Sequence, residues 1–150
     1  MAHLSYTISM NRWKDWWEQA LRDKEKALLD HQHAYYEWAC FTSQQSAEKA
    51  LKALCMAMNL EVWGHSLTGI LKTLKEYGLN IPKEVEKSAR LLDTYYIPTR
   101  YPNGLPAGKP SEYYTEEESE EALRACENIH NFCKSFLFRQ GETPEGAPQV

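Results

Sequence analysis

Apolar residues recur every three or four positions along almost the whole chain, and no stretch alternates apolar and polar residues as a half-buried strand does. The first such stripe contains Trp13, Trp17 and Leu21, and Asn11 precedes it as a suitable N-cap. This pattern predicts a long amphipathic helix and argues against a fold built on a sheet. A chain of 150 residues also buries enough surface for one hydrophobic core.

Residues that begin and end helices divide the rest of the chain into four further helices. We expect these helices at residues 35–58, 66–77, 82–97 and 115–141. Gly78 favours a left-handed helix end, and Thr115 with Glu118 forms the pattern of a capping box. The prolines and glycines of residues 97–110 predict an irregular loop. The expected fold is all-α, an up-and-down bundle of about five helices with two long antiparallel helices as its spine.

The helical pattern assigns one domain to residues 11–141. Residues 1–10 show no helical period, so we expect a loose N-terminal extension there. Residues 142–150 contain Pro, Gly and Glu with few apolar side chains, which indicates a disordered tail. No apolar run approaches the roughly 18–20 residues of a membrane span, so we expect a cytoplasmic protein that does not bind a membrane.

Charge is distributed unevenly along the chain, whose formal net charge is −4. Residues 1–60 are balanced, residues 61–110 carry +2, and residues 111–150 carry −6. A chain with this balance lacks the cations of a histone-like nucleic-acid coat. A site for an anion is therefore expected in the middle of the sequence.

The sequence contains no glycine-rich phosphate loop, no nucleophile elbow and no His-Glu-x-x-His pair. Cys126, His130 and Cys133 share one face of the last helix, and thiolates with imidazole suit zinc. The same stripe also holds Ile129 and Phe136, so we interpret the two cysteines as buried core residues. We expect neither a metal nor another cofactor.

Three polar residues of the second helix are the first candidates for binding. Gln45, Lys49 and Lys52 project to nearly one side by the helical step of about 100° per residue. Such a stripe is typical of a water-facing surface. It is also suited to contact phosphate or the carboxylates of a partner.

The proline-rich loop supplies the second candidate, Arg100, which lies beside Tyr95, Tyr96 and Tyr101 in the sequence. An arginine in this setting binds an anion while a tyrosine stacks on a base or on the guanidinium. Alternatively, it bonds backbone carbonyls and pins the loop to the bundle. The sequence leaves both interpretations open.

Three blocks of sequence in this order carry a family resemblance, and they are Tyr36–Leu54, Gly64–Leu67 and Leu92–Pro102. Through them the chain resembles the HEPN family, the "higher eukaryotes and prokaryotes nucleotide-binding" domain, over roughly residues 11–140. The resemblance implies an up-and-down helical bundle that is often a homodimer. It also implies a neighbouring minimal nucleotidyltransferase, which in some pairs forms a toxin–antitoxin system.

Many members of the wider superfamily are RNases that use an Arg-x(4–6)-His motif. No histidine follows Arg100 at that spacing, whereas Arg124 and His130 match it. Six positions along one helix leave two side chains roughly 120° apart, so we interpret this match as chance. Arg124 and His130 are nevertheless the candidates for catalysis that the sequence offers.

We therefore predict a HEPN-type protein that binds a nucleotide or RNA, a partner minimal nucleotidyltransferase, or both, as in a toxin–antitoxin pair. The expected contact residues are Gln45, Lys49, Lys52, His65, Arg100 and Tyr101. Two alternatives remain open. The chain is a metal-independent endoribonuclease toxin, or it is a purely structural dimerisation module.

Overall fold

The computed structural model describes residues 11–138, which form six α-helices and one 3-10 turn and contain no strand. The elements are α2 (Trp13–Gln32), α3 (Tyr36–Ala57), α4 (Leu67–Glu76), α5 (Lys83–Asp93), η1 (Pro102–Gly104), α6 (Pro110–Tyr113) and α7 (Glu116–Leu137). The predicted all-α class is confirmed, and the short α6 makes one helix more than expected. The expected segments 1–10 and 142–150 lie outside the described residues, as does the predicted end of the last helix at residue 141.

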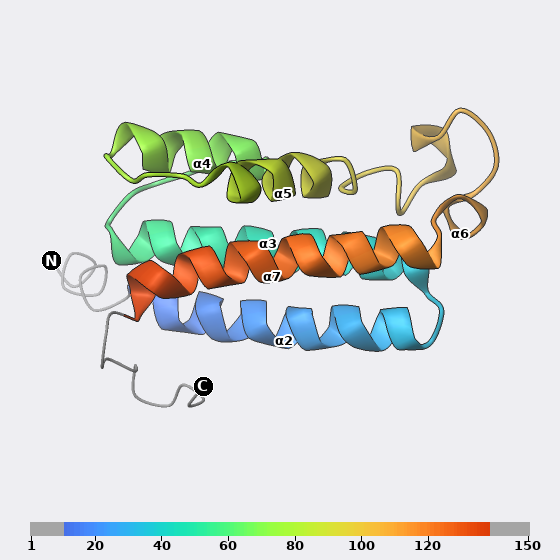
Figure 1. Cartoon of the computed structure of the whole chain (residues 1–150), viewed down its shortest axis with the longest axis horizontal. Helices are drawn as coiled ribbons and strands as arrows, with labels where there is room; N and C mark the ends of the chain where they lie inside the picture. Colours follow the sequence, from blue (N-terminus) through green and yellow to red (C-terminus); the bar gives the residue numbers. More distant parts are fainter. Residues whose placement is uncertain (1–10, 139–150) are drawn as a thin grey trace, which may run out of the picture.

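The predicted spine of two long antiparallel helices is the pair α2 and α3, and α7 is a third long helix beside them. α2 and α3 run antiparallel, and α7 packs against both of them (Figure 1). The shorter α4 and α5 cover the side of α3 and α7 that faces away from α2 (Figure 1). The capping box at Thr115 begins α7 as predicted, and Gly78 follows α4 with a φ of 97°. α5 ends at Asp93, before the expected residue 97.

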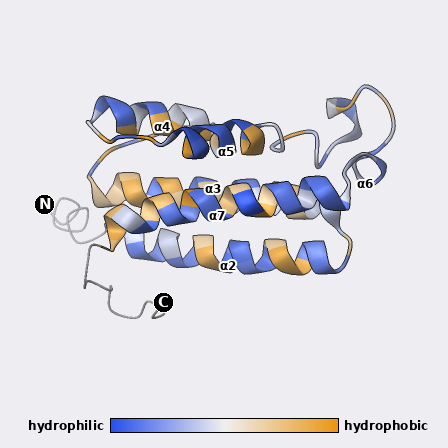
Figure 2. Ribbon diagram, viewed as in Figure 1, coloured by the Kyte–Doolittle hydropathy of each residue, from blue (hydrophilic) through white to orange (hydrophobic). Residues whose placement is uncertain are grey.

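α3 lies at the centre because its stripe of small residues lets neighbouring helices approach closely. Ala39, Ala47, Ala50 and Ala53 are completely buried, and leucines from α3 and α4 fill the space around them. In Figure 2 the polar first half of α7 contrasts with its more apolar second half. The core therefore runs along α3 and continues under the second half of α7.

One buried hydroxyl joins the three long helices. Ser46 on α3 donates to the backbone carbonyl of Ala20 on α2 at 2.7 Å, and its Oγ lies 2.7 Å from Nε2 of His130 on α7. Because a hydroxyl has one proton, His130 Nε2 must be the donor of the second bond. This arrangement fixes the tautomer of the neutral imidazole.

Asp93, the last residue of α5, holds the first turn of α4. Its carboxylate accepts hydrogen bonds from the backbone amides of Leu67 at 2.7 Å and Thr68 at 3.2 Å, and from the Thr68 hydroxyl at 2.8 Å. Ser66 is the N-cap of α4, and its hydroxyl also donates to Asp93. Asp93 thereby fixes the chain next to His65.

Replacing Asp93 with alanine should lower the free energy of unfolding by about 2–3 kcal/mol, because helix α4 loses several charge-assisted hydrogen bonds at its start. Urea unfolding followed by circular dichroism measures this change. Glu76→Ala is the matched control, since Glu76 is exposed at the other end of α4, and it should change stability by less than about 0.5 kcal/mol. Equal effects of the two substitutions would contradict the assigned role of Asp93.

Candidate functional site

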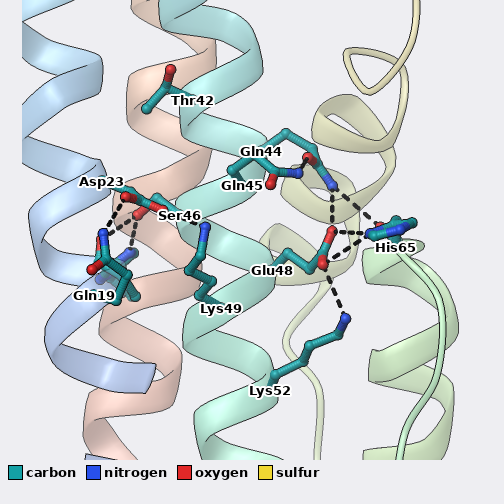
Figure 3. A network of polar contacts seen from close by, with 12 residues as sticks. Gln19, Asp23, Thr42, Gln44, Gln45, Ser46, Glu48, Lys49, Lys52 and His65 are labelled. Atoms are coloured by element: carbon teal, nitrogen blue, oxygen red, sulfur yellow. Dashed lines mark hydrogen bonds and ion pairs between the residues drawn. The ribbon is translucent and has the colours of Figure 1, made fainter. Parts of the chain in front are cut away.

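A carboxylate buried on α3 organises the polar residues on one side of the bundle. The side chain of Glu48 is only 7% exposed. It accepts hydrogen bonds from Lys52 at 3.0 Å and Gln44 at 3.2 Å, and it lies 3.1 Å from His65 Nδ1 (Figure 3). A buried charge is costly without such partners, so Glu48 fixes the side chains around it.

His65 is held on several sides although its side chain is 54% exposed. The Gln44 amide donates to the His65 carbonyl at 3.2 Å, and Gln45 in turn donates to Gln44 at 2.7 Å. The imidazole stacks on Tyr96, with ring centroids 4.5 Å apart. Because the bond to Glu48 places a proton on Nδ1, the other ring nitrogen of a neutral His65 is an acceptor, and no hydrogen bond from residues 11–138 occupies it.

Arg100 lies over three aromatic rings. Its Cζ is 4.3 Å from the ring centroid of Phe41, 4.8 Å from that of Tyr96 and 5.1 Å from that of Tyr101. The Nε donates to the Tyr96 carbonyl at 2.9 Å within the segment that follows α5, and the contact with Phe41 joins this segment to α3. Among residues 11–138 no carboxylate lies within 4.0 Å of this guanidinium. Its terminal nitrogens therefore carry a positive charge that no acidic side chain of this region neutralises.

These contacts form one continuous surface, because Tyr96 touches both His65 and Arg100. We call this surface the His65–Arg100 face, and its members are Phe41, Glu48, Lys52, His65, Tyr96, Arg100 and Tyr101. The ring of Trp38 extends it through Phe41, with centroids 6.2 Å apart. The face combines two fixed cations with two half-buried aromatic rings and the exposed ring of Tyr101, and such a combination is suited to a nucleotide.

The structure brings most of the residues singled out in the sequence to this face, and it separates one of them. Lys52, His65, Arg100 and Tyr101 belong to the face, and Gln45 supports it through Gln44. Lys49 instead points toward α2, where its Nζ lies 2.6 Å from Asp23 (Figure 3). The expectation that Lys49 and Lys52 share one stripe is wrong, because each lysine turns to an acid on a different side of α3.

Glu48 and Phe41 were missed as members of the face, and Gln44 was missed as a residue that supports it. A signal was available, since Gln44 and Glu48 share the helical spacing of Leu51 and Cys55, which are buried. A carboxylate on such a buried stripe requires partners. The sequence alone does not say that His65 is one of them.

Arg124 and His130 do not form a common site. His130 is 2% exposed, bonds Ser46, and packs on Trp17 with ring centroids 5.3 Å apart. Arg124 is exposed on α7, 4.0 Å from Glu120. A histidine enclosed in this way has no access to a substrate phosphate, so the spacing match carries no catalytic geometry.

The cysteines of α7 are buried thiols. Burial raises the pKa of Cys126 to about 12 and also raises the pKa of Cys133, so neither is a ready thiolate ligand. Within the described part of the chain, the one group with metal-like spacing is His31, Glu116 and Glu120, whose ligand atoms lie within 4.8 Å of one another. No helix between residues 11 and 138 is both long and apolar enough to cross a membrane.

Comparison with known proteins gives a consistent picture. The family model described as HEPN domain matches residues 13–136. A protein of Methanocaldococcus jannaschii named "Putative toxin MJ1304" is 30% identical over 124 residues, which cover 75% of this chain and 78% of the relative.

Solved structures show the same architecture. The structure of TT1696 from Thermus thermophilus is 43% identical, with a TM-score of 0.80, and the match covers 84% of this chain and 98% of that one. ST0689, an archaeal HEPN homologue, is 40% identical with a TM-score of 0.72, over 83% and 96% of the two chains. The HEPN domain protein tm0613 from Thermotoga maritima is 36% identical with a TM-score of 0.69, over 84% and 99%.

Buried His130 should make the fold sensitive to mild acid. Burial, followed by the charges of Lys24 and Lys134, lowers the pKa of His130 from 6.5 to about 3. Below pH 6.5 the unfolded chain therefore binds a proton that the folded chain does not. As the pH falls from 6.5 toward 3, the free energy of unfolding therefore decreases by up to about 1.4 kcal/mol per pH unit.

Urea unfolding between pH 7.5 and pH 5 measures this dependence. His130→Gln should remove this part of the slope, while His33→Gln should keep it because His33 is exposed. The same slope in the wild type and in His130→Gln would contradict the assignment.

Proposed function

Because this chain belongs to the HEPN domain family, we propose that it is a toxin-type protein that binds a nucleotide unit of RNA on its His65–Arg100 face. The toxin assignment is supported by the name of the M. jannaschii relative. The choice of ligand is supported by the chemistry of the face.

The observation that carries the proposal is the guanidinium of Arg100, held among three rings with no carboxylate partner in residues 11–138. Its Nε is bonded to a backbone carbonyl, so the terminal nitrogens remain for two oxygens of a phosphate. Tyr101 is 54% exposed and offers a ring on which a base stacks. Lys52 adds a second cation beside Glu48.

Partner binding belongs to the same proposal. A toxin-type protein needs an antitoxin, and a minimal nucleotidyltransferase stays our prediction for that partner. The homodimer also stays a prediction. Exposed Trp38 borders the His65–Arg100 face, so a protein seated there would compete with RNA.

The bond between His65 and Glu48 favours a second candidate function, metal-independent cleavage of RNA. In this reaction His65 Nε2 takes the proton of a ribose 2′-hydroxyl, and the 2′-oxygen attacks the adjacent phosphorus. The bond from phosphorus to the 5′-oxygen breaks, and that oxygen takes a proton from water. Glu48 stabilises the imidazolium. His65 and Arg100 both contact the ring of Tyr96, so Arg100 faces the phosphate next to the ribose that His65 deprotonates.

Arg100→Ala should weaken binding of a fluorescently labelled short single-stranded RNA by about tenfold, as expected for loss of a charge-assisted contact. Fluorescence anisotropy measures the dissociation constant. The affinity of Arg100→Lys for this RNA should fall between those of the wild type and Arg100→Ala, because lysine keeps the positive charge but lacks the planar guanidinium. Arg22→Ala is the control, since Arg22 lies on α2 and its carboxylate neighbour is Glu25 at 3.9 Å. Unchanged affinity in Arg100→Ala would exclude this face as the RNA site.

His65→Gln distinguishes binding from catalysis. Glutamine keeps a donor for Glu48 but lacks a base, so RNA binding should persist within about threefold while cleavage falls by about 100-fold or more. Gel analysis of a labelled RNA, without added metal, gives the rate. At a saturating concentration of RNA, Arg124→Ala should leave that rate unchanged. Cleavage by His65→Gln at the wild-type rate would eliminate the catalytic role of His65. Loss of cleavage in Arg124→Ala alone would assign the catalytic role to Arg124 and His130 of α7 instead.

A further inference from the structure

Two adjacent clefts on the α4–α5–α7 side of the bundle share one arginine. The first has a volume of about 590 Å³, and its cations are Lys87, Arg90 and Arg124 from α5 and α7. The second has a volume of about 370 Å³, and its cations are Lys72, Lys75 and Arg90 from α4 and α5. Arg90 therefore lies between them, on the exposed side of α5.

The cations of the two clefts are largely without ion-pair partners. In the described chain, Lys72, Lys75, Lys87 and Arg90 have no carboxylate within 4.0 Å, and Arg124 reaches Glu120 only at 4.0 Å. The acids that line the clefts are Glu84, Glu86 and Glu121. Five cations thus face three carboxylates, and the clefts have a net positive charge.

The first cleft also has a fixed polar wall. Ser88 is 5% exposed, and its Oγ accepts a hydrogen bond from Asn128 Nδ2 at 3.1 Å, which joins α5 to α7. This bond leaves the Ser88 proton and the Asn128 carbonyl oxygen as further polar groups along the cleft. These groups add hydrogen-bonding partners to the cations of the cleft.

We propose that the two clefts bind a run of phosphate groups that crosses α5 at Arg90. A planar guanidinium contacts two phosphate oxygens at once, and its place between the clefts lets it bridge successive phosphates. Lysines on both sides then neutralise the phosphates that follow. The same chemistry is offered by an oligonucleotide backbone and by inorganic polyphosphate.

This site is separate from the His65–Arg100 face, which is built from α3 and the segments around residues 65 and 100. None of its five cations belongs to that face. The proposal therefore stands whether or not the His65–Arg100 face binds RNA.

Isothermal titration with inorganic tripolyphosphate, at low salt, tests the clefts directly. Arg90→Gln should weaken binding by about tenfold, and Glu121→Gln should strengthen it because a like charge is removed. Arg22→Gln is the matched control, and circular dichroism verifies that each variant is folded. Arg90→Gln should weaken tripolyphosphate binding in the Arg100→Ala background as well, so failure of the proposed function leaves a different signature.

A parallel titration with a short single-stranded RNA identifies the source of the phosphates, with the Arg100→Ala background used to isolate the clefts. If only RNA binds in a way that depends on Arg90, the ligand of the clefts is an oligonucleotide backbone. If only tripolyphosphate does so, the ligand is inorganic polyphosphate. Competition between the two probes supports one shared site. Absence of binding by both probes, or equal affinities in Arg90→Gln and Arg22→Gln, would overturn the proposal.

Discussion

The buried carboxylate of Glu48 couples the packing of the bundle to its candidate site. α3 lies between α2, α4 and α7, so a charge on its inner surface cannot reach water freely. It is instead satisfied by a lysine and a glutamine one turn away on either side, and by His65. Since an unpaired buried charge costs several kcal/mol, these contacts constrain each other. The position of His65 is therefore a consequence of how α3 is buried.

A second constraint acts through the backbone. Asp93 at the end of α5 holds the first turn of α4, and the cap residue of that turn follows His65 directly. Tyr96 and Arg100 lie a few residues beyond Asp93, so the hydrogen bonds of Asp93 help to position these two members of the face as well as His65. His65 and Arg100 are distant in the sequence, and they come together because the end of α5 is bonded to the start of α4. No large cleft is needed to bring them together.

The sequence predicted what depends on local structure. The all-α class, the capping box at Thr115 and the helix end at Gly78 follow from helical period and from residue preferences at helix ends, and all are found. The direction of Lys49 could not be predicted, because it depends on Asp23 of a neighbouring helix. The bond of His65 to Glu48 depends likewise on packing between α3 and the loop before α4. Contacts across elements require the three-dimensional arrangement that periodicity does not contain.

The negative net charge of the chain does not oppose binding of an anion at either surface. The excess carboxylates lie mainly in the first turns of α7, where the partial positive charge of the helix start stabilises them. Exposed charges separated by more than about 8–10 Å are largely screened at physiological salt, so the local balance decides whether a phosphate binds. At the His65–Arg100 face that balance is two cations against the single carboxylate of Glu48, which is already bonded to Lys52 and His65. Within residues 11–138, Arg100 is therefore the cation of this face that has no carboxylate partner, and three aromatic rings hold it in place.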